Sequence, residues 1–402
     1  MKAHLNILLN LLIPLVLLAL SVPAALDCVY LLLQTLMSGR LPPPPPSTRQ
    51  LRFDIVVPAH NEAAGISHTI ANLRQLDWPM DRYRILVVAD NCTDTTAALA
   101  CAAGATVVER FDPTLRGKGY ALLAAFQRSR EDAWADAIAV VDADAEVSSN
   151  LLEAFAARIE HGAHAVQVHY GILNPWRSWR TRLLTVAMAA YHVVRSRARE
   201  RQHVSCGVRG NGWCITHRLL QEVKYEAFSL AEDIEYGIAL GLAGHRVHYA
   251  GEAEASQDMS ATPQAARKQR QRWEHGRFQL IRTRALPLLR AAWQRRSPVC
   301  LDLALDLLVL PFAYVALGVS GLVIAALLAA WWDPGFMPWV WFSLACVLVL
   351  AAYILRGWQL SGTGARGLVA LLGAPTFMVW KLVVMLSRHQ SGEWVRTERK
   401  RS

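Results

Sequence analysis

The 402-residue sequence lacks the cysteine pattern of a disulfide-linked or zinc-binding domain. Its seven cysteines are an odd number, and none stands in a CxxC pair or another paired spacing. Both a disulfide framework and a structural zinc site need such spacing, so the sequence predicts a reduced cytosolic domain with neither. No internal repeat at solenoid periods is present either, which excludes a repeat architecture.

Charge is missing from the beginning of the chain. Across residues 5–37 the only charged side chain is Asp27, and a stretch of this length can span a bilayer. A cleaved signal peptide is the alternative, because Lys2 precedes the apolar run and small residues at 23–25 resemble a cleavage site. The apolar core is too long for that, and hydrophobicity resumes past Asp27, so the sequence favours an uncleaved anchor over residues 1–40.

Acidic residues are outnumbered by basic ones, 32 against 42, which leaves a net charge of +10. The basic residues gather at 195–201, 267–282 and 396–401. Nucleic-acid binding is one interpretation, but the chain has no recognisable motif for it. Positive charge beside apolar segments is typical of cytoplasmic loops that face anionic headgroups. The charge therefore favours a membrane as partner, and no nucleic acid.

The chain is too apolar for an ordinary soluble protein, with 53% hydrophobic residues concentrated at its two ends. Three further apolar segments follow at 303–330, 340–355 and 368–386. The third carries Pro375 and Lys381, so we expect it to be re-entrant or to lie along the interface. The predicted layout is an N-terminal transmembrane anchor (1–40), a proline-rich linker (41–50), a catalytic domain (51–255), amphipathic interface helices (256–300), and a C-terminal transmembrane region with a basic tail (301–402).

Apolar strands alternate with helical segments after the linker. Strand-like runs occupy 53–57, 83–88, 105–108 and 137–141, and a helix is predicted over 119–130. Continuous apolar strands that alternate with helices indicate a parallel α/β sheet. The carboxyl ends of such strands meet at one edge, where open α/β sheets bind ligands. We therefore expect the functional site at that edge.

Acidic residues follow three of these strands: Glu62, Asp90 and Asp142. A carboxylate there can accept hydrogen bonds from a nucleobase or from ribose hydroxyls, although Asp90 could simply cap the next helix. Lys118 stands between two glycines at a predicted helix start, which suits the anion of a nucleotide, with a solvated turn as the alternative.

The Asp-Ala-Asp motif at 142–144 places two carboxylates on the same side of an extended chain. Mg²⁺ and Mn²⁺ prefer such oxygen ligands and complete their shell with diphosphate and water. A solvated loop is the alternative, but five apolar residues run directly into the motif. The sequence therefore predicts Asp142 and Asp144 as ligands of Mg²⁺ or Mn²⁺.

Two later segments carry candidate acceptor residues. Trp213 stands among glycines, which is typical of a stacking platform for a sugar ring, and equally of a core tryptophan in a turn. Glu232 and Asp233 begin a predicted amphipathic helix, whose dipole favours an ionised carboxylate. That placement suits a base and also a simple helix cap.

The segment 267–280 is dense in Arg and Gln and precedes an apolar span. It is predicted to be an interfacial helix with Arg272 and Trp273 facing the site. A membrane-surface helix with no catalytic part is the alternative.

Taken in order, six motifs resemble the membrane-bound family 2 glycosyltransferases with a GT-A fold. The motifs are PAHNE (58–62), VADNCTD (88–94), RGKG (116–119), DAD (142–144), AED (231–233) and QRQRW (269–273). That group includes cellulose synthase, hyaluronan synthase, poly-N-acetylglucosamine synthase and ceramide glucosyltransferase. Two features depart from it: Ala231 stands where cellulose synthases have Thr, and the chain has fewer membrane helices than large polymer synthases.

The resemblance implies an inverting enzyme. Its α/β GT-A domain would bind the nucleotide-sugar on a mostly parallel sheet, between N- and C-terminal transmembrane helices. Asp233 would be the catalytic base. Donor-binding roles would fall to Glu62, Asp90, Lys118, Asp142, Gln269 and Arg272, and acceptor-binding roles to Trp213, Glu232 and Trp273.

The sequence therefore predicts a metal-dependent enzyme of the inner (plasma) membrane, with its catalytic domain in the cytoplasm. It would move a sugar from a UDP-sugar to a polysaccharide chain, with secretion or accessory subunits as further partners. Single transfer to a membrane lipid is the alternative. A non-catalytic, nucleotide-sensing scaffold is a third interpretation, which the retention of every acidic motif disfavours.

Overall fold

The computed structural model describes the backbone of residues 2–259 and 263–376, and the side chains of 11–259 and 273–376. In this part of the chain, eight strands form one mixed sheet in the order β3-β2-β1-β4-β7-β6-β8-β5. The strands are β1 (Phe53–Ala59), β2 (Tyr83–Asp90), β3 (Thr106–Arg110), β4 (Ala137–Val140), β5 (Ala145–Val147), β6 (Ala165–Ile172), β7 (Trp213–Thr216) and β8 (His248–Gln257).

The half of the sheet formed by β3, β2, β1 and β4 is parallel throughout, as the alternating strands and helices predict. β7 then pairs antiparallel with both β4 and β6. The result is the mostly parallel GT-A sheet. β1 is apolar along nearly its whole length because helices cover both faces of the sheet, so neither set of alternating side chains meets water.

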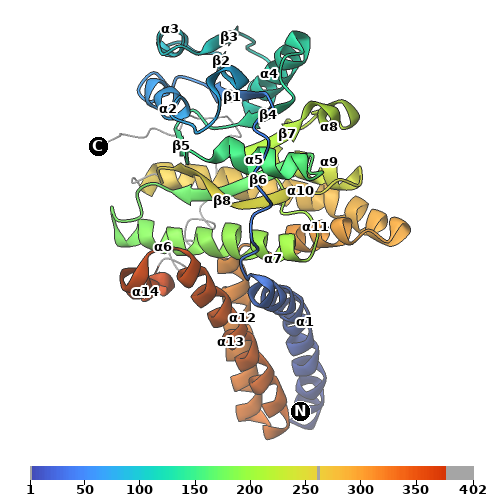
Figure 1. Cartoon of the computed structure of the whole chain (residues 1–402). Coiled ribbons are helices and arrows are strands. Elements are labelled where there is room, and N and C mark those ends of the chain that lie inside the picture. Colours follow the sequence, from blue (N-terminus) through green and yellow to red (C-terminus); the bar gives the residue numbers. More distant parts are fainter. Residues whose placement is uncertain (1, 260–262, 377–402) are drawn as a thin grey trace.

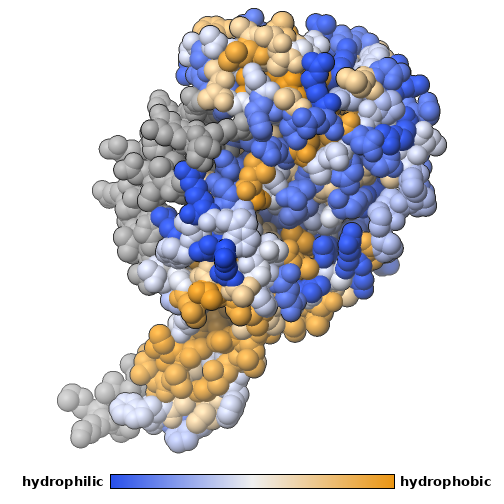
Figure 2. All heavy atoms as spheres, turned by 60° about the vertical axis from the view of Figure 1, so that its left-hand side comes forward, coloured by the Kyte–Doolittle hydropathy of each residue, from blue (hydrophilic) through white to orange (hydrophobic). Residues whose placement is uncertain are grey.

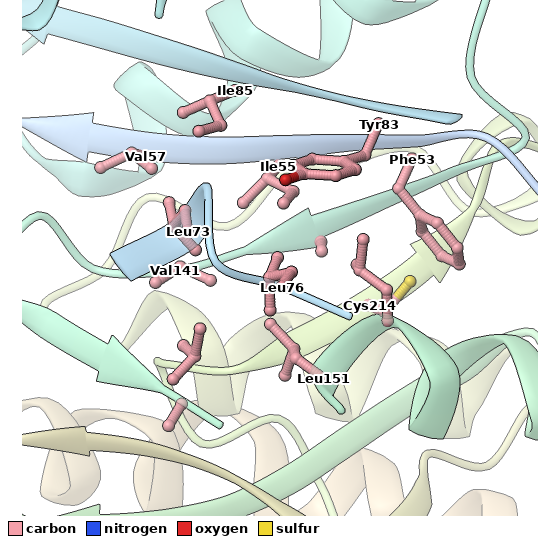
Figure 3. Close-up of a cluster of buried hydrophobic side chains, with 14 of the residues drawn as sticks. Phe53, Ile55, Val57, Leu73, Leu76, Tyr83, Ile85, Val141, Leu151 and Cys214 are labelled. Atoms are coloured by element: carbon pink, nitrogen blue, oxygen red, sulfur yellow. The ribbon is translucent and has the colours of Figure 1, made fainter. Parts of the chain in front are cut away.

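Two hydrophobic cores lie on opposite faces of the sheet. One packs α2 (Ile66–Leu73) and α5 (Leu151–Glu160) against the strands. Figure 3 shows part of it, with Ile55, Val57 and Val141 of the sheet region beside Leu73. The other packs α4 (Lys118–Asp132), α8 (His217–Glu222) and α9 (Glu232–Leu242). The remaining short elements of the domain are η1 (Met80–Arg82) and α3 (Thr96–Ala102).

A helical layer separates this domain from the membrane helices (Figure 1). It comprises α6 (Trp179–Met188), the π-helical turn η2 (Ala189–Val194), α7 (Arg195–Arg201), α10 (Pro263–Arg295), α11 (Pro298–Leu308) and α14 (Gly364–Leu371). Single π-turns inside helices are often found at functional sites.

Three helices in the described residues are long and apolar enough to cross a membrane. They are α1 (Lys2–Met37), whose candidate span is Leu11–Met37, α12 (Phe312–Trp332), and α13 (Met337–Leu360), whose span begins at Pro334 in the turn η3 (Pro334–Phe336). They pack together as a stem below the catalytic domain (Figure 1). Figure 2 shows the stem covered by hydrophobic residues, in contrast to the mostly hydrophilic domain above it.

Two predicted segments differ from the structure. The apolar segment 303–330 is not one span, because α11 ends at Leu308 and Pro311 precedes α12. Residues 303–308 belong instead to the helical layer, where Asp302 and Asp306 are buried. Of the segment 368–386, α14 ends at Leu371, and residues 377–386 lie outside the described part of the chain.

Candidate active site

A cavity of about 1300 Å³ opens at the carboxyl ends of β1, β2 and β4 and continues to the start of α12. Eight of the predicted site residues with described side chains line it: Glu62, Asp90, Lys118, Asp142, Asp144, Glu232, Asp233 and Trp273. The cavity therefore lies at the edge of the sheet where the strand ends predict it.

Two asparagines shape the edge of the sheet at the strand ends. Asn61 and Asn91 both adopt left-handed backbone conformations, which asparagine tolerates better than most residues. Asn61 Oδ1 accepts a hydrogen bond from the backbone N–H of Thr93 at 2.7 Å, and so ties the two strand-end loops together. Asp90, at the end of β2, is buried. Its Oδ1 forms a salt bridge with Arg110 Nη1 at 2.6 Å.

Lys118 is the centre of a second group of contacts. Its Nζ donates to Asp142 Oδ1 and to the carbonyl oxygen of Gly210, each at 2.5 Å, and lies 3.9 Å from Glu232 Oε1. It stands at the start of α4, where Gly119 is required, because a Cβ there would lie 2.3 Å from the carbonyl oxygen of Ala227. The close packing of this turn fixes the ammonium group of Lys118 in the cavity.

Asp142 is held from its other side. Its backbone N–H donates to Asn211 Oδ1 at 3.0 Å, and its Oδ2 accepts a hydrogen bond from Gln257 Nε2. Asp142 and Asp144 face one cavity with hard oxygen ligands, and each carboxylate oxygen carries two lone pairs. The pair therefore fits a divalent cation that shares these oxygens with Lys118 and Gln257.

Glu232 and Asp233 begin α9, as predicted, and both side chains face the cavity. Asp233 lies against Gly210, where a Cβ would be 3.2 Å from Asp233 Oδ2, and Gly210 has a positive φ of 83°. The glycine thus lets the loop before β7 approach the carboxylate closely. Together with Lys118 and Asp142, these two residues form what we call the acidic cluster.

Burial changes the titration of this cluster. Burial raises the pKa of Glu232 to about 7, and the neighbouring Asp233 charge adds to this effect. The positive charge of Lys118 lowers the pKa, but by less. Burial likewise raises the pKa of Asp233, although backbone N–H groups and Lys118 act to lower it. The helix dipole alone would keep both ionised, so desolvation is the stronger effect here. The pair titrates as a unit.

The expected role of Trp213 is wrong. Its side chain is 2% exposed and packs edge-on against Phe126 at a ring distance of 6.1 Å, within the core beneath α4. Trp273, by contrast, is 39% exposed and faces the cavity. The side chains of Gln269 and Arg272, predicted to hold the diphosphate, lie outside the described residues.

Several residues that support the site have no motif of their own. Arg110 pairs with Asp90, while Asn211 and Gln257 orient Asp142. Arg110 ends β3, beside the end of β2 in the sheet, so the strand register could have indicated it. Gln257 comes from β8, and no sequence signal brings it to Asp142.

The mixed sheet has a cavity at its strand ends, acidic residues on the cavity wall and a lysine at a helix start. This is the arrangement that the resemblance to family 2 glycosyltransferases predicts. Residues 50–276 match the family model described as "Glycosyltransferase like family 2". The chain belongs to this family.

The chain is similar to two curated bacterial enzymes. It is 27% identical over 310 residues to beta-monoglucosyldiacylglycerol synthase of Synechocystis sp., a match that covers 66% of this chain and 60% of that one. It is 32% identical over 133 residues to 4,4'-diaponeurosporenoate glycosyltransferase of Staphylococcus aureus, 31% of this chain and 34% of that one. The chain therefore spans less than two thirds of either relative.

A solved structure shares the fold across most of the chain. It is the mannosyltransferase PcManGT from Pyrobaculum calidifontis, in complex with GDP-Man and Mn²⁺. The TM-score is 0.51 at 18% identity, and the match covers 86% of this chain and 98% of that one. This likeness confirms the GT-A fold, and the family model confirms the expected resemblance to family 2.

Proposed function

We propose that this enzyme transfers a sugar from a UDP-sugar to a hydroxyl group of a membrane lipid. The observation that carries the proposal is the course of the cavity. It leads from the carboxylates at the strand ends to Phe312, the first residue of the span α12, and to Ile354 in the span α13. A lipid that lies among these helices can present its headgroup to the catalytic domain without leaving the membrane.

Of the two acceptors left open by the sequence, the lipid suits this arrangement better than a polysaccharide. The names of both curated relatives support it, since one contains a diacylglycerol and the other 4,4'-diaponeurosporenoate. Polysaccharide extension stays an alternative outcome of the product analysis below.

The transfer itself is a single displacement. The oxygen of the acceptor hydroxyl attacks the anomeric carbon as Asp233 takes its proton. The new carbon–oxygen bond forms while the bond to the diphosphate breaks, and the electron pair leaves with the nucleoside diphosphate. One displacement inverts the anomeric configuration.

The remaining residues hold the donor. Glu62 and Asp90 bind the nucleoside, and Lys118 sits where it can stabilise the charge that develops on the diphosphate. Asp142 and Asp144 would hold Mg²⁺ or Mn²⁺, which neutralises part of the diphosphate charge when bound. Arg272 and Gln269 are proposed to contact the diphosphate from α10, with Glu232 and Trp273 beside the acceptor.

Product analysis tests the proposal directly. The purified protein is incorporated in lipid vesicles and supplied with a panel of isotope-labelled UDP-sugars and Mn²⁺. We expect the label in the organic extract, as a lipid one hexose heavier by mass spectrometry. Label only in a water-soluble polymer contradicts the lipid acceptor and favours chain extension.

We further propose that the catalytic domain faces the cytoplasm, where nucleotide-sugars are made, and that the basic tail lies on the same side. Positive residues at 388–401 support this orientation, since basic segments favour the cytoplasmic face. A cysteine placed at Ser402 should resist a membrane-impermeant thiol reagent in intact cells and react after lysis. Modification in intact cells contradicts this topology and leaves the catalytic assignment intact.

A further inference from the structure

Four arginine side chains are buried where the catalytic domain meets the helical layer. Arg195 and Arg199 come from α7, Arg209 from the loop before β7, and Arg277 from α10. Each is at most 7% exposed. We call them the arginine cluster.

The first two arginines are matched by carboxylates of α11. Arg195 Nη1 lies 2.9 Å from Asp306 Oδ1, and Arg199 Nε lies 2.5 Å from Asp302 Oδ2. Arg195 Nε also donates to the hydroxyl of Tyr353 at 3.1 Å. This half of the cluster joins α7 to α11 and α13.

Arg209 and Arg277 line the cavity, as does Arg195, and they are incompletely paired among the described residues. Arg209 Nη1 and Arg277 Nη1 both donate to the hydroxyl of Tyr191, at 2.7 and 3.2 Å. Among the described residues, Arg209 Nη2 and Arg277 Nε have no hydrogen-bond partner, and Arg209 Nη2 is still 3.6 Å from Asp306 Oδ2. Arg199 Nη2 also lacks one, but Arg199 does not line the cavity.

Buried charged donors without partners are costly, and an anion in the cavity satisfies them. Within the described part of the chain, each of the two guanidinium groups has one such nitrogen, since Arg209 Nε donates to the carbonyl oxygen of Cys206 and Arg277 Nη2 to that of Val309. A phosphate oxygen accepts charge-assisted hydrogen bonds of this kind. The two incompletely paired arginines therefore define an anion subsite.

The place of this subsite limits what can occupy it. Arg209 adjoins Gly210, which contacts Asp233, so the subsite lies beside the proposed base. Beyond the arginines the cavity is lined by Leu183 and Val186 of α6, and by Phe312 at the start of α12. The cavity thus combines a carboxylate, two cations and an apolar wall that includes the first residue of a membrane helix.

We propose that the acceptor is an anionic phospholipid whose headgroup carries a hydroxyl beyond its phosphate. The phosphate binds Arg209 and Arg277, the hydroxyl reaches Asp233, and the acyl chains leave along α6 and α12. This inference rests on the proposed lipid acceptor and specifies its headgroup. The bonds formed and broken are those of the sugar transfer, and the phosphate is unchanged.

A matched pair of acceptors tests the headgroup. Phosphatidylglycerol and diacylglycerol with the same acyl chains both offer a glycerol hydroxyl, and only the first carries a phosphate. In vesicles of a zwitterionic carrier lipid, we expect kcat/KM for phosphatidylglycerol to be at least about tenfold higher, the ratio expected of a hydrogen bond to a charged group. Equal rates, or a preference for diacylglycerol, overturn the inference and leave the lipid acceptor standing.

Substitution assigns the preference to the subsite. Arg209→Gln should reduce the ratio of kcat/KM for phosphatidylglycerol to kcat/KM for diacylglycerol to about one. Arg209→Lys should keep part of the preference for phosphatidylglycerol. Arg356→Gln is the control, because Arg356 lies near the end of the candidate span α13, bonds to Ser38 and does not line the cavity. It tests for general attraction to an anionic vesicle and should keep the wild-type ratio.

The ratio is measured within each variant, so a partly unfolded preparation lowers both rates and leaves it unchanged. A loss of donor affinity in Arg209→Gln with an unchanged ratio would show that the arginines hold the donor diphosphate, and it overturns the inference. Efficient use of soluble glycerol phosphate overturns the lipid part of it. Failure of both lipids contradicts the proposed function itself.

Discussion

Two buried groups of charged residues lie along one cavity, and they are opposite in composition. In the acidic cluster a single lysine faces the carboxylates of Asp142, Glu232 and Asp233. In the arginine cluster four guanidinium groups surround Asp302 and Asp306. Burial penalises charge in both clusters, and the charges next to each carboxylate decide whether they outweigh this penalty. The pKa of Asp302 is raised, because burial and the neighbouring Asp306 outweigh Arg199.

The difference appears in the titration of the carboxylates. Burial raises the pKa of Glu232 to about 7, because one lysine cannot compensate for two neighbouring carboxylates. Burial also acts to raise the pKa of Asp306, but Arg199, Arg209 and Arg195 outweigh it and hold that pKa well below its usual range. A carboxylate whose pKa lies near neutral pH is suited to proton transfer. A carboxylate that is always ionised is suited to a structural salt bridge.

The largest effect should come from the proposed metal ligand Asp144, two residues after Asp142 of the acidic cluster. Asp144→Asn removes a ligand charge from the cavity surface, so we expect loss of Mn²⁺- or Mg²⁺-dependent turnover in a folded protein. Glu146→Gln is the matched control, since Glu146 bonds to His68 at 2.9 Å and does not line the cavity. A near-normal rate for Asp144→Asn would show that the metal assignment is wrong.

Substitution of a carboxylate in the arginine cluster should lower the stability of the folded protein. Asp306→Asn leaves buried guanidinium groups without their counter-charge, and we expect the free energy of unfolding to fall by roughly 3–5 kcal/mol. Asp132→Asn breaks a surface pair with Arg84 and Arg128 and should cost about 1 kcal/mol or less. Denaturation of both variants in detergent measures the contrast. Equal losses would mean that the buried cluster is no more important than a surface pair.

A smaller effect should appear in the pH dependence of transfer. Because folding raises the pKa of both carboxylates of the pair, the base is protonated at acid pH and becomes ionised as the pH rises. We expect kcat/KM to increase with pH across the range in which Glu232, whose pKa is about 7, and Asp233, whose pKa is raised, lose their protons. Glu232→Gln removes a like charge and should move the profile to lower pH. A profile that falls across this range, or that Glu232→Gln leaves in place, contradicts a coupled base.

Much of this site could be predicted because its residues follow strands. Glu62, Asp90 and Asp142 each stand at or shortly after the end of an apolar run, and the carboxyl ends of parallel strands must meet at one edge. The start of α9 at Glu232 also follows from local sequence, because apolar residues recur there at helical spacing. These are local signals, and the sheet topology makes them converge.

Contacts between distant segments could not be predicted in the same way. Trp213 stands among glycines at the site, yet strand pairing turns its side chain into the core. The basic composition of the run at 195–201 did not predict burial, yet Arg195 and Arg199 are buried against α11. One signal was present: Arg195 and Arg199, like Asp302 and Asp306, are four residues apart and share one helix face.

The most direct test of the account is the rate of transfer in Asp233→Asn. The substitution keeps the shape of the side chain and removes its ability to take a proton, so we expect the donor dissociation constant to be unchanged. The rate of sugar transfer should fall by roughly 10²–10⁴-fold, the usual contribution of a general base. A parallel loss of donor affinity and rate, or a near-normal rate, would contradict the assignment of Asp233 as the base and with it the proposed reaction.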